Sequence, residues 1–114
     1  VARSLASGEP QTNAKTIGGI CDAIITPTPG TITFPIMKRL CGAGIVVPEE
    51  DCLRAMSVAF TRLKIVLEPG GAIALAAALY HKDVISSEEV ICIASGGNVD
   101  PKIFKQSLID YPCK

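Results

Sequence analysis

The sequence has few aromatic residues and no excess of either charge. It contains no Trp, and aromatic residues make up 4% of its 114 residues. Eleven Lys and Arg balance eleven Asp and Glu, so the clustered basic excess of a nucleic-acid-binding protein is absent and we expect no nucleic-acid partner. The longest apolar run, residues 72–80, is far shorter than the roughly 20 residues that span a bilayer, so we expect no membrane segment.

Histidine is also scarce, and the cysteines do not form a metal-binding pattern. The single His81 cannot anchor a multi-histidine site, and no C-x-x-C pair occurs. We therefore predict no metal site and no disulfide framework, but free thiols in a reducing, cytoplasmic compartment. The five cysteines are widely spaced: Cys21, Cys41, Cys52, Cys92 and Cys113.

The composition that is present indicates one packed domain. Hydrophobic residues account for 48% of the chain and charged residues for 19%, which excludes a disordered protein. The length corresponds to about one domain. Because the chain opens with Val1 and no initiator Met precedes it, we expect a piece of a longer protein, with a processed small protein as the alternative.

Two neighbouring segments predict helices of different kinds. The first starts at Pro48, carries acidic residues at 49–51 where a helix N-terminus favours them, and runs to Leu67 before Pro69. The second, Gly70–Tyr80, is apolar all round and must be covered on nearly every side, as in the centre of a larger body or an oligomer interface. The first helix has one apolar stripe, formed by Leu53, Met56, Phe60, Leu63 and Leu67.

The remaining segments predict short helices and strands. Residues 3–6 and 33–40 are expected to be helical, with Thr33 as the cap of the second, and Pro101 begins a final helix. The β-branched runs 45–47 and 90–94 predict strands. Since helices and strands alternate, the predicted fold class is α/β.

Three short segments are candidates for chemistry. Ser95-Gly96-Gly97-Asn98 follows a predicted strand, at the edge where open α/β sheets bind ligands, and paired glycines let a flat ligand approach the backbone. The alternative is a plain turn. Glu68 heads the apolar helix, where it either lines a site or only stabilises that helix end, and Asp22-Ala23 is a third candidate or a plain loop.

Taken together, these segments resemble the C-terminal part of the threonine/serine dehydratase family, pyridoxal-phosphate enzymes of fold type II that are tryptophan synthase beta-like. The resemblance covers nearly the whole chain from Thr28-Pro29-Gly30 onward. It implies an open sheet flanked by helices. The motifs that carry it are Ala55-Met56, Leu67-Glu68-Pro69-Gly70-Gly71-Ala72, and Ile91-Cys92-Ile93-Ala94-Ser95-Gly96-Gly97-Asn98-Val99-Asp100.

The resemblance implies a cofactor-binding role for five residues. Ser95 matches the serine that hydrogen-bonds the pyridine nitrogen of pyridoxal 5′-phosphate, and Gly96 and Gly97 would let the ring lie against the strand end. Glu68 matches a glutamate that lines the cofactor side of the cleft. Ala23 aligns where many relatives have glycine, which puts the backbone contact there in doubt.

The family's Schiff-base lysine and phosphate-binding glycine loop have no counterpart in the sequence. The resemblance therefore implies that residues 1–114 are the C-terminal part of the catalytic (large) domain, with no catalytic residue of its own and with the remainder of a parent chain as partner. We expect the fragment to be inactive alone and the parent to form a homo-oligomer.

The implied parent activity is that of a lyase, an ammonia-lyase of amino-acid metabolism. It would eliminate water and ammonia from L-threonine- or L-serine-type hydroxy-amino acids to give 2-oxo acids. A serine racemase or a compatible-solute (hydroxyectoine-type) dehydratase of the same fold is one alternative. A non-catalytic α/β binding or oligomerisation domain is another.

Overall fold

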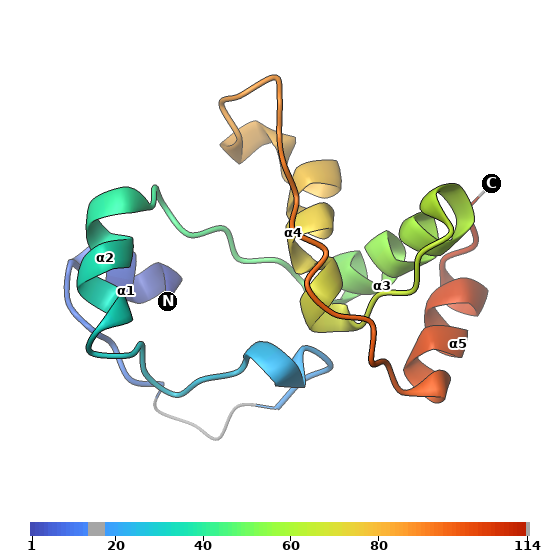
Figure 1. Cartoon of the computed structure of the whole chain (residues 1–114), viewed down its shortest axis with the longest axis horizontal. Coiled ribbons are helices and arrows are strands. Elements are labelled where there is room, and N and C mark those ends of the chain that lie inside the picture. The colour runs from blue at the N-terminus through green and yellow to red at the C-terminus, as the bar shows by residue number, and fades with distance from the viewer. Residues whose placement is uncertain (14–17, 114) are drawn as a thin grey trace. The chain divides into compact units, whose positions relative to one another are not determined.

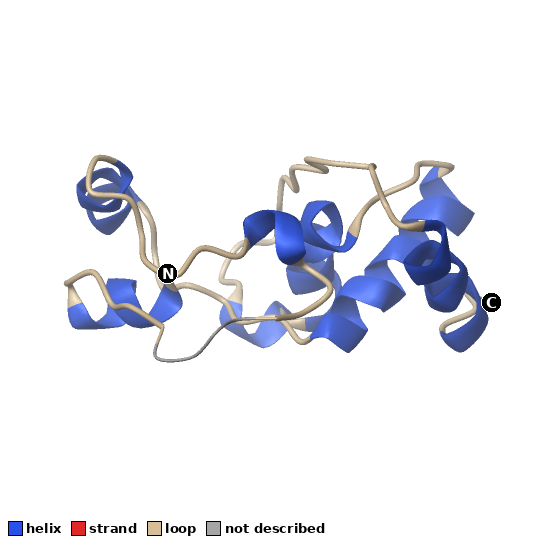
Figure 2. Ribbon diagram, turned by 90° about the horizontal axis from the view of Figure 1, so that it is seen from below, coloured by secondary structure: helices blue, strands red, loops and turns tan. Residues whose placement is uncertain are grey.

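The computed structural model describes residues 1–13 and 18–113, and every regular element in those ranges is helical (Figure 2). The chain divides into two compact units, Val1–Gly18 with Ile24–Val46, and Gly19–Ala23 with Val47–Lys114. The longest helix has 12 residues, and none of the described helices meets the length and hydropathy of a membrane span.

The first unit contains two short helices, α1 (Ala2–Ser7) and α2 (Thr33–Leu40), which confirm the helices predicted there. α1 ends at Gly8, whose φ of 77° is the left-handed conformation that closes many helices. The predicted cap of α2 is wrong by one residue, because Ile32 is the N-cap. Thr33 instead donates its hydroxyl to the carbonyl of Gly30 at 3.3 Å.

The second unit is built around α3 (Glu49–Val58), which begins after Pro48 as predicted and carries three acidic residues in its first turn. A five-residue π-helical turn, η2 (Ala59–Leu63), continues it. The predicted extension to Leu67 is wrong, because Lys64 has a φ of 60° and its left-handed conformation reverses the chain.

The predicted apolar stripe of α3 is correct only in its first half. Leu53 is 7% exposed and Met56 is fully buried, whereas Phe60 and Leu63 are 39% and 58% exposed. A π turn has more residues per turn than an α-helix, so it rotates the later positions away from the face that the 3.6-residue period predicts. Leu67 is nevertheless buried, although it lies in the non-helical chain that follows η2.

Two further helices pack against α3 and form, with it, the helix cluster (Figure 1). They are α4 (Pro69–Tyr80), which is close to its predicted bounds, and α5 (Pro101–Asp110), which begins at Pro101 as predicted. Ala72 and Ala76 are fully buried, and their small side chains let α4 approach α3 closely. The other faces of α4 are only half-buried by the described residues, so the complete cover expected for this helix is not found in them.

Polar contacts connect the end of α4 to α3. His81 Nε2 lies 2.9 Å from Asp51 Oδ2, which connects the end of α4 to the first turn of α3. Arg54 pairs with Glu50 at 2.7 Å and lies 6.0 Å from the ring centre of Tyr80. The contacts of His81 and Tyr80 add to the apolar packing of α4 on α3, whereas the Arg54–Glu50 pair lies within α3.

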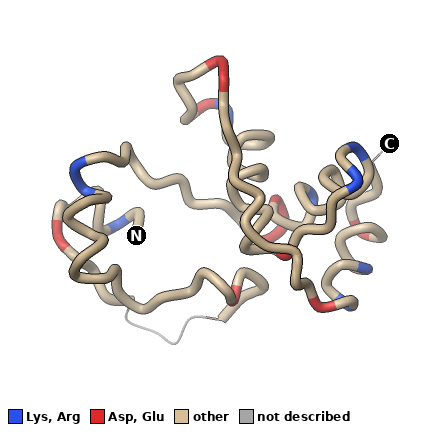
Figure 3. The backbone as a smooth tube through the Cα atoms, in the orientation of Figure 1, with Lys and Arg blue, Asp and Glu red and all other residues tan. Residues whose placement is uncertain are grey.

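The two predicted strands are extended chain without strand pairing, so the predicted open sheet is not formed by the described residues. A strand obtains its backbone hydrogen bonds only from a neighbouring strand, and no such neighbour lies beside either segment within those residues. Residues 90–94, the apolar extended segment, belong to a charge-free stretch (Figure 3). Ile91 and Ile93 are 92% and 69% exposed.

Candidate functional site

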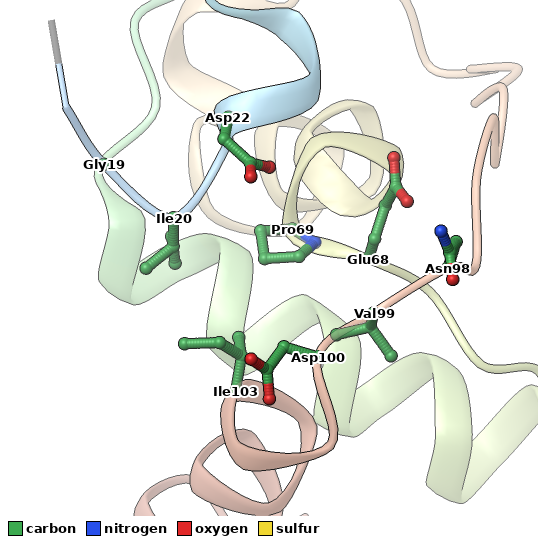
Figure 4. A pocket seen from close by; sticks show the side chains of 9 residues that line it. All are labelled: Gly19, Ile20, Asp22, Glu68, Pro69, Asn98, Val99, Asp100 and Ile103. Atoms are coloured by element: carbon green, nitrogen blue, oxygen red, sulfur yellow. The ribbon is translucent and has the colours of Figure 1, made fainter.

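The second unit contains a cavity of about 400 Å³ next to the first turn of α4 (Figure 4). Its walls come from three segments that are distant in the sequence: the chain at residues 19–22, the start of α4, and the chain leading into α5. The lining residues are Gly19, Ile20, Asp22, Glu68, Pro69, Asn98, Val99, Asp100 and Ile103.

Glycines allow two of these segments to touch through their backbones. A Cβ on Gly71 would clash with the Gly96 carbonyl oxygen and lie 2.8 Å from the Gly96 nitrogen, and a Cβ on Gly97 would lie 2.7 Å from the Val66 carbonyl oxygen. The Glu68 N–H donates to the Gly96 carbonyl at 3.0 Å. The glycine motif after the extended segment is therefore fitted to the start of α4, and any side chain would push them apart.

Glu68 is the N-cap of α4, and its half-buried side chain makes no capping hydrogen bond. The carboxylate lies instead against Gly96, where a Cβ would come within 2.7 Å of Glu68 Oε1. Hydrogen-bonded capping, the usual structural use of a residue at this position, therefore does not account for Glu68. Its negative charge still favours the N-terminus of α4.

The charge of the cavity wall selects among ligand groups. Asp22, Glu68 and Asp100 contribute carboxylates, and none of its described lining residues is Lys or Arg. Asp100 is committed to the fold, because Oδ1 accepts from the Lys102 N–H at 2.7 Å and caps α5. Such a wall repels a phosphate group. No group of three or more potential ligand side chains among the described residues could hold a metal ion.

The five predicted site residues are only partly brought together. Glu68 lines the cavity, and Gly96 lies directly against its carboxylate. Gly97 packs on Val66 instead. Ser95 is exposed and outside the lining, and within the described residues its hydroxyl makes no hydrogen bond.

Ala23 is also exposed and outside the lining, in the short 3-10 turn η1 (Asp22–Ile24), whereas its neighbour Asp22 lines the cavity. Asn98 and Asp100 line it too, although sequence reasoning assigned neither a role. Signals for all three existed. Asp22 and Asn98 belong to segments that the sequence analysis names as candidates, and Asp100 stands before a helix-starting proline.

Comparison with known proteins places the chain in a family. Residues 1–96 match the family described as "Pyridoxal-phosphate dependent enzyme". The chain is 43% identical over 101 residues to a protein named "Serine racemase" from Dictyostelium discoideum, and 36% identical over 83 residues to "L-threonine ammonia-lyase" from Geobacter sulfurreducens. These alignments cover 86% and 73% of this chain.

Solved structures are similar over most of the chain. A threonine deaminase from the organism abbreviated T.th. superposes with a TM-score of 0.81 at 35% identity, covering 87% of this chain. Maize serine racemase superposes with a TM-score of 0.80 at 34% identity, covering 96%. The chain spans about a third of the length of both structures, since it covers 35% of each, and 31% of the Dictyostelium protein.

Proposed function

Because the chain belongs to the family of pyridoxal-phosphate-dependent enzymes, we propose that residues 1–114 form the C-terminal part of the catalytic domain of an enzyme that processes hydroxy-amino acids. In the leading form of this proposal the enzyme eliminates water from serine or threonine and then releases ammonia, leaving a 2-oxo acid. The names of the relatives support the substrate class, since they are racemases and ammonia-lyases of such amino acids.

The glycine-lined contact between Glu68 and Gly96 is the observation that carries the proposal. It holds a carboxylate next to a backbone without side chains, one residue from the exposed hydroxyl of Ser95. A flat heteroaromatic ring needs this kind of surface, because bare backbone permits close approach and a nearby hydroxyl can meet the ring nitrogen. An exposed hydroxyl beside a glycine pair and a carboxylate is thus the chemistry that supports a place for the ring of pyridoxal 5′-phosphate here.

The acidic wall does not fit the phosphate of the cofactor, and none of the described residues that line the cavity is a lysine. In this proposal the remainder of the longer chain would bind the phosphate and supply the lysine. The proposal therefore assigns to these residues the ring side of the cofactor alone, and it predicts no turnover by the 114-residue chain. Formation of a 2-oxo acid from serine or threonine by this chain alone would contradict that division.

In this proposal Ser95 is the residue that would meet the ring nitrogen. A hydroxyl both donates and accepts hydrogen bonds and, unlike a carboxylate, does not hold the ring nitrogen protonated. The bound cofactor supplies an electron sink for the negative charge left when the α-proton of the amino acid departs. The Ser95 hydroxyl would thus set the strength of that sink, and Glu68 would add a negative charge next to Gly96.

The open sheet also belongs to the longer protein in this proposal. The apolar extended segment needs neighbouring strands to satisfy its backbone and cover its isoleucines, and the half-buried faces of α4 need further cover. We assign that cover to the rest of the parent chain and, for α4, to a second copy in a homo-oligomer.

Racemisation of serine is the second candidate, favoured by the 43% identity to the Dictyostelium racemase. A hydroxyectoine-type dehydratase is a third candidate of the same fold. The test is product analysis with the longer protein, given L-serine and L-threonine in separate reactions. Dominant 2-oxo acid and ammonia support the dehydratase. D-serine as the main product supports the racemase instead, and neither product from either substrate would overturn the assignment to hydroxy-amino acids.

A further inference from the structure

The second unit holds two free thiols in contact beside the candidate cavity. Cys21 Sγ and Cys52 Sγ lie 3.7 Å apart, in thiol hydrogen-bond contact, and both cysteines are free. Cys52 belongs to α3 and is fully buried, whereas Cys21 is half-buried. The wide spacing in the sequence concealed this pair, because the two residues are 31 positions apart.

Cys21 lies within a segment that forms one wall of the cavity. Its neighbours Ile20 and Asp22 both line that cavity. A second contact holds the same segment to α3, because the Ile20 N–H donates to Glu49 Oε1 at 3.0 Å. Besides the apolar packing of Ile20 and Cys21 on the core, this hydrogen bond and the thiol pair hold the wall to α3.

We propose that Cys21 and Cys52 form a redox modification site, a dithiol that low-molecular-weight disulfides convert to a disulfide that fastens the wall of the cavity to α3. This inference does not rest on the proposed function. A disulfide needs sulfur atoms about 2.05 Å apart, so the two must approach by less than about 2 Å, within reach of side-chain rotation.

The reaction proceeds by two exchanges. The half-buried Cys21 thiolate attacks one sulfur of the small disulfide, which forms a mixed disulfide and expels one small thiolate. The Cys52 thiol then loses its proton and attacks the Cys21 sulfur, which forms the internal bond and expels the second small thiolate. In total two protein thiols are oxidised and one small disulfide is reduced to two thiols.

The environment makes the reduced pair slow to react at neutral pH. Burial raises the pKa of Cys21, and burial with the neighbouring Cys21 and Asp51 raises the pKa of Cys52 to about 12. Little thiolate is then present, so the pair withstands brief exposure to an oxidant and responds to a sustained change of redox poise. Incubations should accordingly last hours.

The test is equilibration of the 114-residue chain with glutathione at graded ratios of oxidised to reduced form, followed by quenching, alkylation, tryptic digestion and mass spectrometry. Cys41 shares the tryptic peptide ending at Arg54 with Cys52, so the experiment uses the Cys41→Ser variant. The expected product links the peptide ending at Lys38 to the one ending at Arg54, while Cys92 and Cys113 remain open to alkylation. A parallel incubation in urea should lose this preference.

Two outcomes would overturn the proposal. One is accumulation of glutathione on Cys21 without the linked peptide. The other is pairing in buffer as random as pairing in urea. A Cys52→Ala variant is the matched control and should retain glutathione on Cys21. Hydrogen exchange tests the structural consequence: oxidation should slow exchange at the amides of residues 20–22, and unchanged exchange there would show that the bond does not fasten the wall.

Discussion

The helix cluster and the apolar extended segment are both rich in aliphatic residues, yet only the first is folded on itself. In the cluster Met56, Ala72 and Ala76 are fully buried, whereas Ile91 in the extended segment is 92% exposed. Hydropathy is therefore not what separates the two regions. The backbone groups of a helix form hydrogen bonds with one another, whereas those of a strand need a neighbouring strand.

The difference explains how the second unit is assembled. Helices α3, α4 and α5 need only side-chain packing to associate, and buried alanines permit a short distance between α3 and α4. The extended segment is joined to α4 by the Cys92 thiol, which donates to the Ala74 carbonyl at 3.5 Å, and just past its end by the contact of Gly96 with Gly71. The candidate site lies where the helix cluster meets the apolar extended segment, which needs a neighbouring strand.

The largest expected effect concerns the buried core. Met56→Ala should lower the free energy of unfolding by about 2–5 kcal/mol, because it leaves a cavity between α3 and α4. Ile91→Ala, a comparable loss of apolar volume on the exposed segment, should change it by less than about 0.5 kcal/mol. Urea denaturation followed by circular dichroism measures both, and equal losses would erase the distinction between the regions.

The contact between the two regions should be next in sensitivity. Gly71→Ala places a methyl group against the Gly96 backbone, which cannot move aside as a flexible side chain could, so we expect a loss of about 1–3 kcal/mol. The matched control is Gly42→Ala, since nothing lies within 4 Å of a Cβ there. If both variants unfold at the same urea concentration, the close approach of α4 to the glycine motif is incorrect.

The two acidic N-caps should behave differently. Asp100→Ala removes the cap of α5 and should cost about 0.5–2 kcal/mol, while Asp100→Asn keeps the acceptor and most of the stability. Glu68→Gln should cost less, because its side chain makes no capping bond. Thermal unfolding of the three variants checks this, and a greater loss from Glu68→Gln than from Asp100→Ala would assign Glu68 a structural role.

The smallest effect near neutral pH comes from the buried thiol in the core. Burial raises the pKa of Cys52 from 9.0 to about 12, so the folded state holds this proton more tightly than the unfolded state. Its contribution to stability is complete below about pH 9 and declines as the pH rises toward 12. Denaturation at several alkaline pH values should show a shallower decline in Cys52→Ala, and identical declines would refute the assignment.

The sequence predicted the helices better than the strands. The bounds of α2 and α4 and the start of α5 followed from proline, glycine and apolar spacing, which act locally. The end of α3 could not be predicted, because the π turn and the left-handed Lys64 leave no mark in the periodicity. The strand predictions failed for a non-local reason, since a strand forms only beside another strand and the described residues supply none.

The candidate site was predicted in the same uneven way. Glu68 and Gly96 were found because they belong to short motifs, and their contact confirms that these motifs meet. Asp22 belongs to a candidate segment of the sequence and does line the cavity, whereas Asp100 was missed as a lining residue, since only the folded chain brings it there. The same holds for the Cys21–Cys52 pair, which no spacing rule indicates.

The role of Ser95 is the central claim, and the absorbance spectrum of the longer protein with bound pyridoxal phosphate tests it most directly. Ser95→Ala should shift the cofactor band and lower the rate about five- to thirtyfold, the loss of about 1–2 kcal/mol expected for one hydrogen bond. Ser86→Ala, an exposed serine in the loop after α4, should change neither. An unchanged band and rate in Ser95→Ala would contradict the account.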